Sequence, residues 1–454
     1  MVASKTTTTK RTKSDDNLLI APKLMYALSS GGQSALVNFL PVFYDQLQYD
    51  KVQIGLLQTL PCICSMVAPP LWGAVADAIR NQRLVHIACV LSGAVLLYLI
   101  QFTRTFELTM LVVAVANFQG APGGSLLDHA VLDLLAKVGG EYGKQRLFGA
   151  VGWGAMAYVS GLVVAVAGIS WAFNLSLIVT LASLLVLRTI PPVRSGHHDD
   201  GYAVLEGEGA SGSKPPSFRE GLRLLAKKGD VLVLLVVVFL MGLMFGVLSS
   251  FLTLNLYNLS GNNSQIIGIA IACETASELP AFFFSQAIIR KLGTVNVLLV
   301  SIAGYAARLT YLAVMTNPWG AIPFEFLHGL TFGLAWAACT QYVYAAAPRG
   351  AEGTVMGILN AVQNGLGRGA GTLVGGYFYQ NYGAPTMWLV TDLGVPLALA
   401  GVALFAYLKN ADEAEAEDEL LESAELFSPH HGDPVARKSP RNTPAAPSYD
   451  PIDG

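Results

Sequence analysis

Charge is scarce in this chain. Of its 454 residues only 13% are Asp, Glu, Lys or Arg, whereas 53% are hydrophobic and the mean hydropathy is +0.49. A soluble domain of this size carries about 25% charged residues, so the composition argues against an ordinary soluble protein. The net charge of −3 gives no reason to expect a nucleic-acid partner.

Recognisable reactive chemistry is also lacking. We find no metal-ligand cluster, glycine-rich phosphate loop or nucleophile constellation, and therefore expect no metal, no cofactor and no enzymatic activity. Residues 1–20 are polar, which predicts no cleavable signal peptide and makes the first helix its own insertion signal. The cysteines are expected to be small buried hydrophobic side chains. All five lie in apolar stretches: Cys62, Cys64, Cys89, Cys273 and Cys339.

Long apolar blocks are what the chain does have. A helix needs about 20 mostly apolar residues to cross a bilayer, and only helices or closed barrels satisfy their backbone there. Barrel strands alternate apolar and polar residues, whereas these blocks are continuous. We predict an all-α membrane protein with twelve transmembrane helices. The predicted spans are 22–44, 52–76, 84–103, 107–136, 145–168, 170–189, 230–257, 264–290, 294–315, 320–346, 352–380 and 385–408.

A polar segment divides the spans into two groups of six. Residues 190–229 are rich in Gly, Ser, Pro and acidic residues, which is typical of a flexible linker. We therefore predict two six-helix bundles in one monomeric chain. The predicted parts are a tail (1–21), the first bundle (22–189), the linker (190–229), the second bundle (230–408) and a disordered tail (409–454).

The positions of Lys and Arg predict the orientation. Most of the 28 fall in the N-terminal segment, in the loops after every second span, or in the tail, and only Lys51 and Arg104 fall in the opposite loops. By the positive-inside rule, both termini are cytoplasmic. Asp15 to Ile20 resembles an acidic dileucine signal, and Tyr449 to Ile452 resembles a tyrosine-based one. These signals favour the plasma membrane or an endosomal or vacuolar membrane.

Ionisable residues inside the spans are the candidate site. Each costs about 2.5–3.5 kcal/mol on insertion scales, so they are expected to have partners or to line a pathway. At about 1.5 Å per residue, Arg308 and Glu325 lie at one level, and we predict that they pair beside a central cavity. Glu325 and His328 share a helix face, and histidine changes charge near neutral pH. The predicted proton-coupling network is Glu274, Glu278, Arg308, Glu325, His328 and Arg368; the alternative is a fixed structural charge network.

A loop motif follows the second span. Gly73, Asp77, Arg80 and Arg83 resemble the conserved cytoplasmic loop of the major facilitator superfamily, although the glycine usual between the basic residues is missing. The resemblance implies a gating loop that latches the inward-closed state. Anchoring of a helix end at the interface is the alternative.

A second resemblance extends over residues 22–408. Gln53-Ile-Gly55, Pro69-Pro70-Leu-Trp-Gly73, the segment Tyr142 to Gly149 and Glu325-Phe-Leu-His328-Gly-Leu-Thr-Phe332 are similar to the group related to lactose permease and the nucleoside–proton symporters, including the major facilitator domain-containing protein 6 type. It implies the major facilitator fold and a cavity lined by the first, fourth, seventh and tenth spans. The candidate contacts on such a cavity are Gln33, Asn38, Asp128, Asn255 and Trp336.

Three functions remain open. The first is a secondary active transporter that moves a small polar solute (a sugar, nucleoside or similar metabolite) together with protons. The second is a receptor or nutrient sensor with the same fold and no net transport, for which the long polar segments are the only support. The third is an intramembrane enzyme or a channel, but the sequence contains no ring of like charges or filter that a channel needs.

Overall fold

The computed structural model describes residues 19–79, 81–190, 228–347 and 352–426. Every regular element in these ranges is helical. Residues 1–408 form one compact unit, and residues 409–454 form a second one that is described by itself.

The first half contains elements that follow the six predicted spans. Their bounds are α2 (Ile20–Val37), α3 (Leu40–Gln46), α4 (Lys51–Ile79), α5 (Gln82–Leu99), η1 (Ile100–Phe102), α6 (Phe106–Gly120), α7 (Gly123–Val138), α8 (Tyr142–Ala167) and α9 (Ser170–Leu187).

The second half follows its predicted spans with more interruptions. It contains α11 (Gly229–Leu259), α12 (Gln265–Val314), η2 (Pro318–Ala321), α13 (Ile322–Glu325), η3 (Gly329–Leu334), α14 (Ala335–Ala346), α15 (Glu352–Asn360), η4 (Ala361–Gly367), α16 (Arg368–Asp392) and α17 (Gly394–Leu426). Both η3 and η4 are π-helices, in which the backbone makes wider turns than in an α-helix.

Within the described ranges, eight helical stretches are long and apolar enough to cross a membrane. Two of them contain a glycine in the left-handed region, Gly293 (φ 77°) in α12 and Gly383 (φ 82°) in α16, so each holds two helical segments. These glycines fall at or next to predicted boundaries between spans. Large apolar side chains such as Val166 and Leu185 are exposed, as lipid-facing surfaces require. The molecule is an all-α membrane protein.

Proline explains the break in the first span. Pro41 has no backbone N–H to bond the carbonyl of Val37, and α2 ends at that residue. The side chain of Asn38 instead donates to the carbonyl of Ser34, at 3.0 Å. Asn38 therefore lies at the interruption between α2 and α3.

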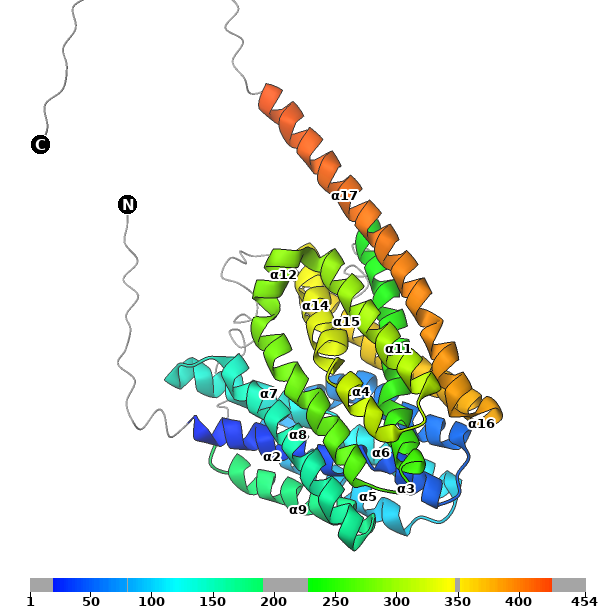
Figure 1. Ribbon diagram of the computed structural model, residues 1–454. Coiled ribbons are helices and arrows are strands. Elements are labelled where there is room, and N and C mark those ends of the chain that lie inside the picture. Colours follow the sequence, from blue (N-terminus) through cyan, green and yellow to red (C-terminus); the bar gives the residue numbers. More distant parts are fainter. Residues whose placement is uncertain (1–18, 80, 191–227, 348–351, 427–454) are drawn as a thin grey trace, which may run out of the picture. The chain divides into compact units, whose positions relative to one another are not determined.

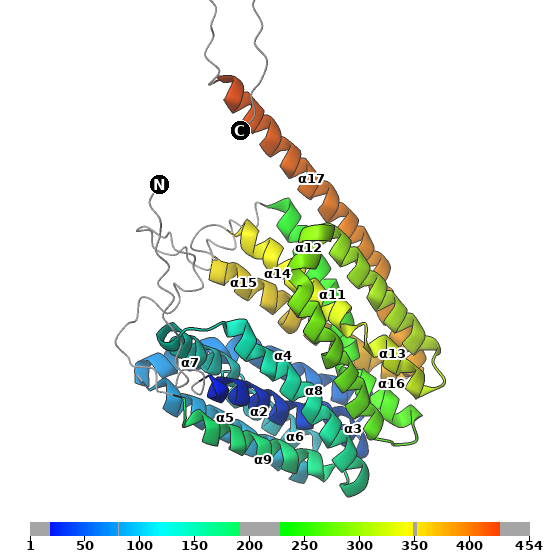
Figure 2. The ribbon, with the colours of Figure 1, turned by 60° about the vertical axis from the view of Figure 1, so that its left-hand side comes forward.

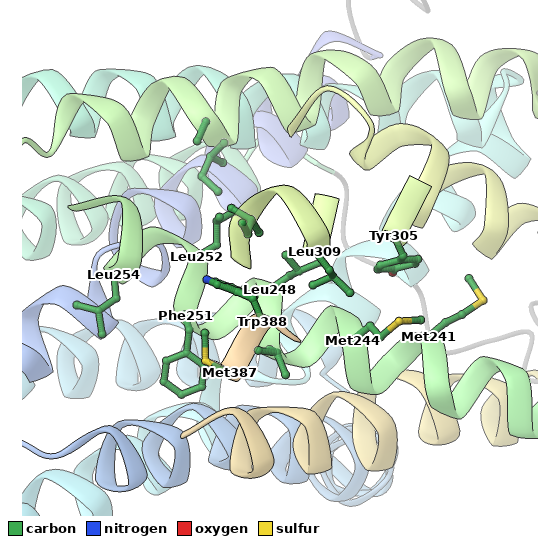
Figure 3. Close-up of a cluster of buried hydrophobic side chains, with 14 of the residues drawn as sticks. Met241, Met244, Leu248, Phe251, Leu252, Leu254, Tyr305, Leu309, Met387 and Trp388 are labelled. Carbon is green, nitrogen blue, oxygen red and sulfur yellow. The ribbon is translucent and has the colours of Figure 1, made fainter. Parts of the chain in front are cut away.

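The two halves pack side by side. The helices of the first half (blue to blue-green) and those after Gly229 (bright green onward) form neighbouring groups in Figures 1 and 2. Between them α8 packs against α12, and α4 against α16. The second half has its own apolar core, in which Phe251 of α11, Leu309 of α12 and Trp388 of α16 are fully buried (Figure 3).

Contacts between the halves gather at one end, which carries the loops after α3 and α11. Ser264 donates to the carbonyl of Gly161 at 3.3 Å, and the amide of Lys51 donates to Oε1 of Gln380 at 2.8 Å. The helices nearly touch there, because a methyl group on Gly161 would lie 3.0 Å from Cα of Gly268. At the opposite end, a methyl group on Gly73 or Gly357 would meet no atom within 4 Å. The halves are therefore in close contact at the first end.

The C-terminal tail begins as a helix. Disorder is predicted from residue 409 onward, with a helix in the acidic part as the alternative, and α17 runs to Leu426. This stretch is rich in Ala, Glu and Leu, which are strong helix formers. The linker at 191–227, most of the N-terminal tail and the two sorting-like motifs lie almost entirely outside the described residues.

Candidate functional site: a charged network beside a central cavity

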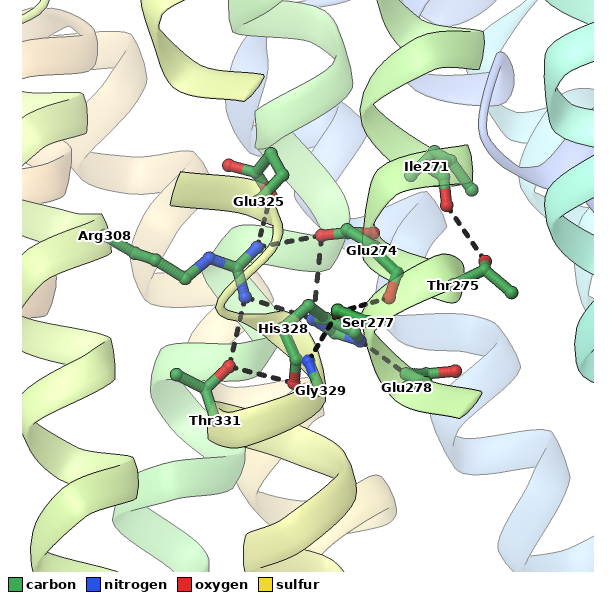
Figure 4. Close-up of polar contacts among 10 residues, drawn as sticks. All are labelled: Ile271, Glu274, Thr275, Ser277, Glu278, Arg308, Glu325, His328, Gly329 and Thr331. Atoms are coloured by element: carbon green, nitrogen blue, oxygen red, sulfur yellow. Dashed lines mark hydrogen bonds and ion pairs between the residues drawn. The ribbon is translucent and has the colours of Figure 1, made fainter. Parts of the chain in front are cut away.

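Arg308 of α12 is the centre of the predicted network (Figure 4). One of its terminal nitrogens donates to Glu325 and also to Oε1 of Glu274, the latter at 2.8 Å. The other lies 3.0 Å from Nδ1 of His328 and donates to the Thr331 hydroxyl at 3.2 Å. The predicted pairing of Arg308 with Glu325 is thus present.

His328 extends the network toward Glu278. Its Nε2 lies 3.0 Å from Oε1 of Glu278, and its Nδ1 lies 3.6 Å from Oε1 of Glu274. Five of the six predicted network residues are therefore connected. Because a guanidinium only donates, Nδ1 of His328 accepts from Arg308, and a proton on Nε2 of the ring faces Glu278.

A close crossing of two helices brings these groups together. The amide of Gly329 donates to the hydroxyl of Ser277 on α12 at 2.8 Å, rather than continuing the α-helical ladder. A side chain at Gly329 would run into the Ser277 carbonyl, so only glycine allows this approach. The carbonyl of Leu330 accepts from Ser301 at 2.8 Å. Neighbouring helices thus satisfy the irregular backbone of η3 and hold His328 over Glu278.

Burial makes the network electrostatically strong. The side chain of Arg308 is 1% exposed and that of Glu325 is 0% exposed, while Glu274 and Glu278 are 15% and 18% exposed. Buried charges cost several kcal/mol each unless they are paired. Arg308 contacts Glu274 and Glu325, and Glu278 contacts His328. With neutral His328, the three carboxylates of this network outnumber its one arginine.

The network forms one wall of a central cavity of about 320 Å³. Glu274, Glu278 and His328 reach its surface, whereas Arg308 and Glu325 lie behind them. The first half contributes neutral groups. The lining is Ser30, Val37, Asn38, Gly149, Ala150 and Trp153 from that half, and Phe245, Leu248, Ser249, Leu252, Thr253, Ile271, Glu274, Glu278, His328, Phe332 and Arg368 from the second.

Aromatic rings join the network to Arg368. The ring of Phe245 stacks on that of Phe332 with centroids 4.9 Å apart, and Phe332 stacks on His328 at 5.5 Å. The guanidinium of Arg368 lies over Phe245, 5.3 Å from its centroid. Arg368 was predicted in the network, but it makes no ion pair among the described residues and instead donates from Nε to Ser249 at 3.1 Å.

The five predicted cavity contacts do not all reach the cavity. Asn38 lines the cavity. Gln33 is exposed, Asn255 is buried and Trp336 is half-buried, and none of these three is among the lining residues. Asp128 lies away from the cavity: it accepts from Tyr26 at 2.5 Å and lies 3.6 Å from Arg146.

The predicted gating loop is described only in part. Gly73 lies within α4, and Arg83 donates to the Leu187 carbonyl at 2.9 Å, which ties the start of α5 to the end of α9. Arg80 and the side chain of Asp77 lie outside the described residues. The gating role stays a prediction.

Several site residues had no signal in the sequence. Ser277, Ser301 and Thr331 are common residues in helices, and only the crossing at Gly329 gives them their roles. Phe245 and Trp153 resemble any apolar residue of a span. The described residues contain no group of three or more His, Cys, Asp or Glu that could hold a metal ion.

Comparison with known proteins gives a family match. The family model described as "MFS_1 like family" matches residues 19–390. The maltose permease of Geobacillus stearothermophilus is 26% identical over 404 residues, which cover 87% of this chain and 95% of that protein. The "Major facilitator superfamily domain-containing protein 6-like protein B" of Xenopus laevis is 21% identical over 215 residues, 44% of this chain and 35% of that protein.

A solved structure shares the fold. The crystal structure of the nucleoside transporter NupG superposes with a TM-score of 0.71 at 18% identity, covering 86% of this chain and 99% of that one. The two-bundle arrangement drawn from the sequence therefore matches a known transporter architecture.

Proposed function

The chain belongs to the MFS_1 like family of the major facilitator superfamily, and from that premise we propose that it is a proton-coupled transporter of a small polar solute. That it is a secondary transporter of small solutes follows from its family and relatives. Polarity of the solute and the use of protons are the proposal. The network of Arg308, Glu274, Glu325, His328 and Glu278 at the cavity wall carries it.

The cavity favours a solute with hydroxyl or amide groups. Ser30, Asn38, Ser249 and Thr253 place neutral hydrogen-bonding groups on its surface, and Trp153 adds an indole ring. Two relatives named above are, by their printed names, a maltose permease and a nucleoside transporter. Both names describe small solutes that combine hydroxyl groups with a ring, which supports a polar ring compound here.

The network supplies a site for the coupled proton. His328 bridges Glu278, which faces the cavity, and the buried pair of Arg308 and Glu325. A proton arriving from the cavity can reside on Glu278 or His328 and reduce the excess of negative charge. The solute then binds next to a neutralised wall. Coupling follows because the proton changes the free energy of solute binding in the cavity.

The conformation supports alternating access. The halves are in close contact at the end that carries the loops after α3 and α11. By the distribution of Lys and Arg, this end is proposed to face outward. The structure would then correspond to an inward-facing state, in which solute and proton are released to the cytoplasm.

Uptake into proteoliposomes tests the proposal. With radiolabelled sugars and nucleosides, an inwardly directed proton gradient should accelerate uptake by the wild-type protein several-fold. Glu325→Gln and His328→Ala should remove the acceleration, because each takes a protonatable group from the network. Glu107→Gln is the matched control, since Glu107 is exposed at the start of α6.

Two results would count against the proposal. Uptake that ignores the gradient in the wild type and in both variants would leave the network a fixed structural one. Binding of a solute with no uptake at all would favour the alternative of a receptor or nutrient sensor with the transporter fold.

A further inference from the structure

Arg368 is a cation without a counter-ion at the cavity surface. Among the residues that the structure describes, its guanidinium makes no ion pair, and its one hydrogen bond runs from Nε to Ser249. The remaining N–H groups have no partner in that part of the chain. All lining residues are described, and Arg368 is the one Arg or Lys among them.

The placement of this arginine needs an explanation. A charged side chain within a membrane span is costly, and such residues almost always pair with a partner or face a water-filled cavity. Arg308 has two glutamates within hydrogen-bonding distance, whereas Arg368 contacts neutral groups, the Ser249 hydroxyl and the face of Phe245. These two contacts hold the guanidinium in place and leave its outer edge free for a ligand.

We propose that Arg368 binds a carboxylate or phosphate group of the transported solute. The inference rests on the proposed function and narrows it to solutes that carry a negative charge. Guanidinium groups bind both anions through two parallel N–H bonds, which are roughly twice as strong as neutral hydrogen bonds. The rings of Phe245 and Phe332, beside Arg368, provide a flat surface for the ring of such a solute.

Charge balance links this anion to the proton. Glu274, Glu278 and Glu325 oppose Arg308 and Arg368, which gives a net charge of −1 for the wall and its network when His328 is neutral. A monoanion entering the cavity would bring the net charge to −2. One proton on the wall offsets the added charge, so the anion binds best after the proton. Transport of a monoanion with one proton moves no net charge, whereas a neutral solute with one proton moves a charge of +1.

Matched pairs of ligands test the proposal on the purified full-length protein. The pairs are glucose with glucuronate, and uridine with uridine 5′-monophosphate, so that the carboxylate and phosphate arms are separate. Stabilisation against thermal unfolding is measured for each compound. The charged member of each pair should stabilise the wild type more than its neutral partner does. Arg368→Gln should weaken their binding at least about tenfold, since a hydrogen bond to a charged group is lost.

Further variants separate binding from structure. Arg368→Lys keeps the positive charge but loses the two parallel N–H groups of the guanidinium. Its affinity for the charged ligands should therefore fall between those of the wild type and Arg368→Gln. Arg104→Gln removes an exposed arginine away from the cavity and should leave binding unchanged. In proteoliposomes, uptake of the stabilising monoanion should ignore a membrane potential set with potassium and valinomycin, because no net charge moves.

The outcomes distinguish this inference from the proposed function. Stabilisation and potential-sensitive uptake of neutral members, unchanged in Arg368→Gln, would overturn the anion site and leave proton-coupled transport standing. Binding of an acid that depends on Arg368 without any uptake would overturn transport and leave the anion site standing. No stabilisation by any of the compounds would count against both.

Discussion

The two halves of the molecule handle their charged residues in opposite ways. The second half buries Arg308, with 1% of its side chain exposed, among carboxylates at the cavity wall. In the first half, Arg146 pairs loosely with Asp128 at 3.6 Å and keeps 63% of its side chain exposed. The first half gives the cavity only neutral groups. If the proposed function is correct, proton coupling and charge recognition belong to the second half, and hydrogen bonding to neutral parts of the solute belongs to the first.

The largest expected effect is a difference in stability between variants of two arginines, Arg308 and Arg146. Arg308→Gln leaves Glu274 and Glu325 buried near each other without their cation, which should cost about 3–5 kcal/mol of stability. Arg146→Gln removes an exposed pair and should cost about 1 kcal/mol or less. Thermal unfolding of both variants in detergent measures the difference. Adding Glu325→Gln to Arg308→Gln should recover part of the loss. Equal costs for the two arginines would contradict the proposed division between the halves.

The levels of the charged residues were predictable from the sequence, but their rotation about the helix axes was less so. A rise of about 1.5 Å per residue was enough to place Arg308 opposite Glu325. The same counting could not tell that Arg368 faces Ser249 and Phe245 rather than the network. The depth of a residue in the membrane depends only on its position along the helix. The direction in which its side chain points also depends on how the neighbouring helices pack.

The π-helix η3 gives a specific reason for one missed contact. Phe332 lines the cavity, and in an α-helix Trp336, four residues later, would lie on the same face. The wider turns of η3, which ends at Leu334, rotate the residues that follow by part of a turn relative to the face that Phe332 occupies. Trp336 is therefore not among the lining residues. The backbone irregularity depends on Ser277 and Ser301 of another helix, so no local pattern could reveal it.

Two glycines of η3, Gly329 and Gly333, differ in how closely the neighbouring helix approaches them. In Gly329→Ala the new methyl group would lie 3.0 Å from the amide nitrogen of Glu278 and closer still to the Ser277 carbonyl. The helices must then separate, which should cost about 1–3 kcal/mol and move His328 away from Glu278. In Gly333→Ala the nearest atom, Cβ of Ala281, is 3.5 Å away, an ordinary contact. Gradient-driven uptake should fall only in the first variant; equal uptake in both would mean that this crossing does not position the proton site.

The smallest effect is expected in the first half. Asn38 lines the cavity, and its amide also bonds the carbonyl four residues earlier at 3.0 Å; Asn117 makes the same bond at 2.8 Å away from the cavity. Asn38→Ala should raise KM for the solute by about tenfold or less, because one neutral hydrogen bond to the solute is lost. Asn117→Ala should leave KM unchanged. The ratio of uptake with and without a proton gradient should be the same in both variants, because the proposed proton site lies in the second half. A change in that ratio for Asn38→Ala would show that coupling extends across the cavity.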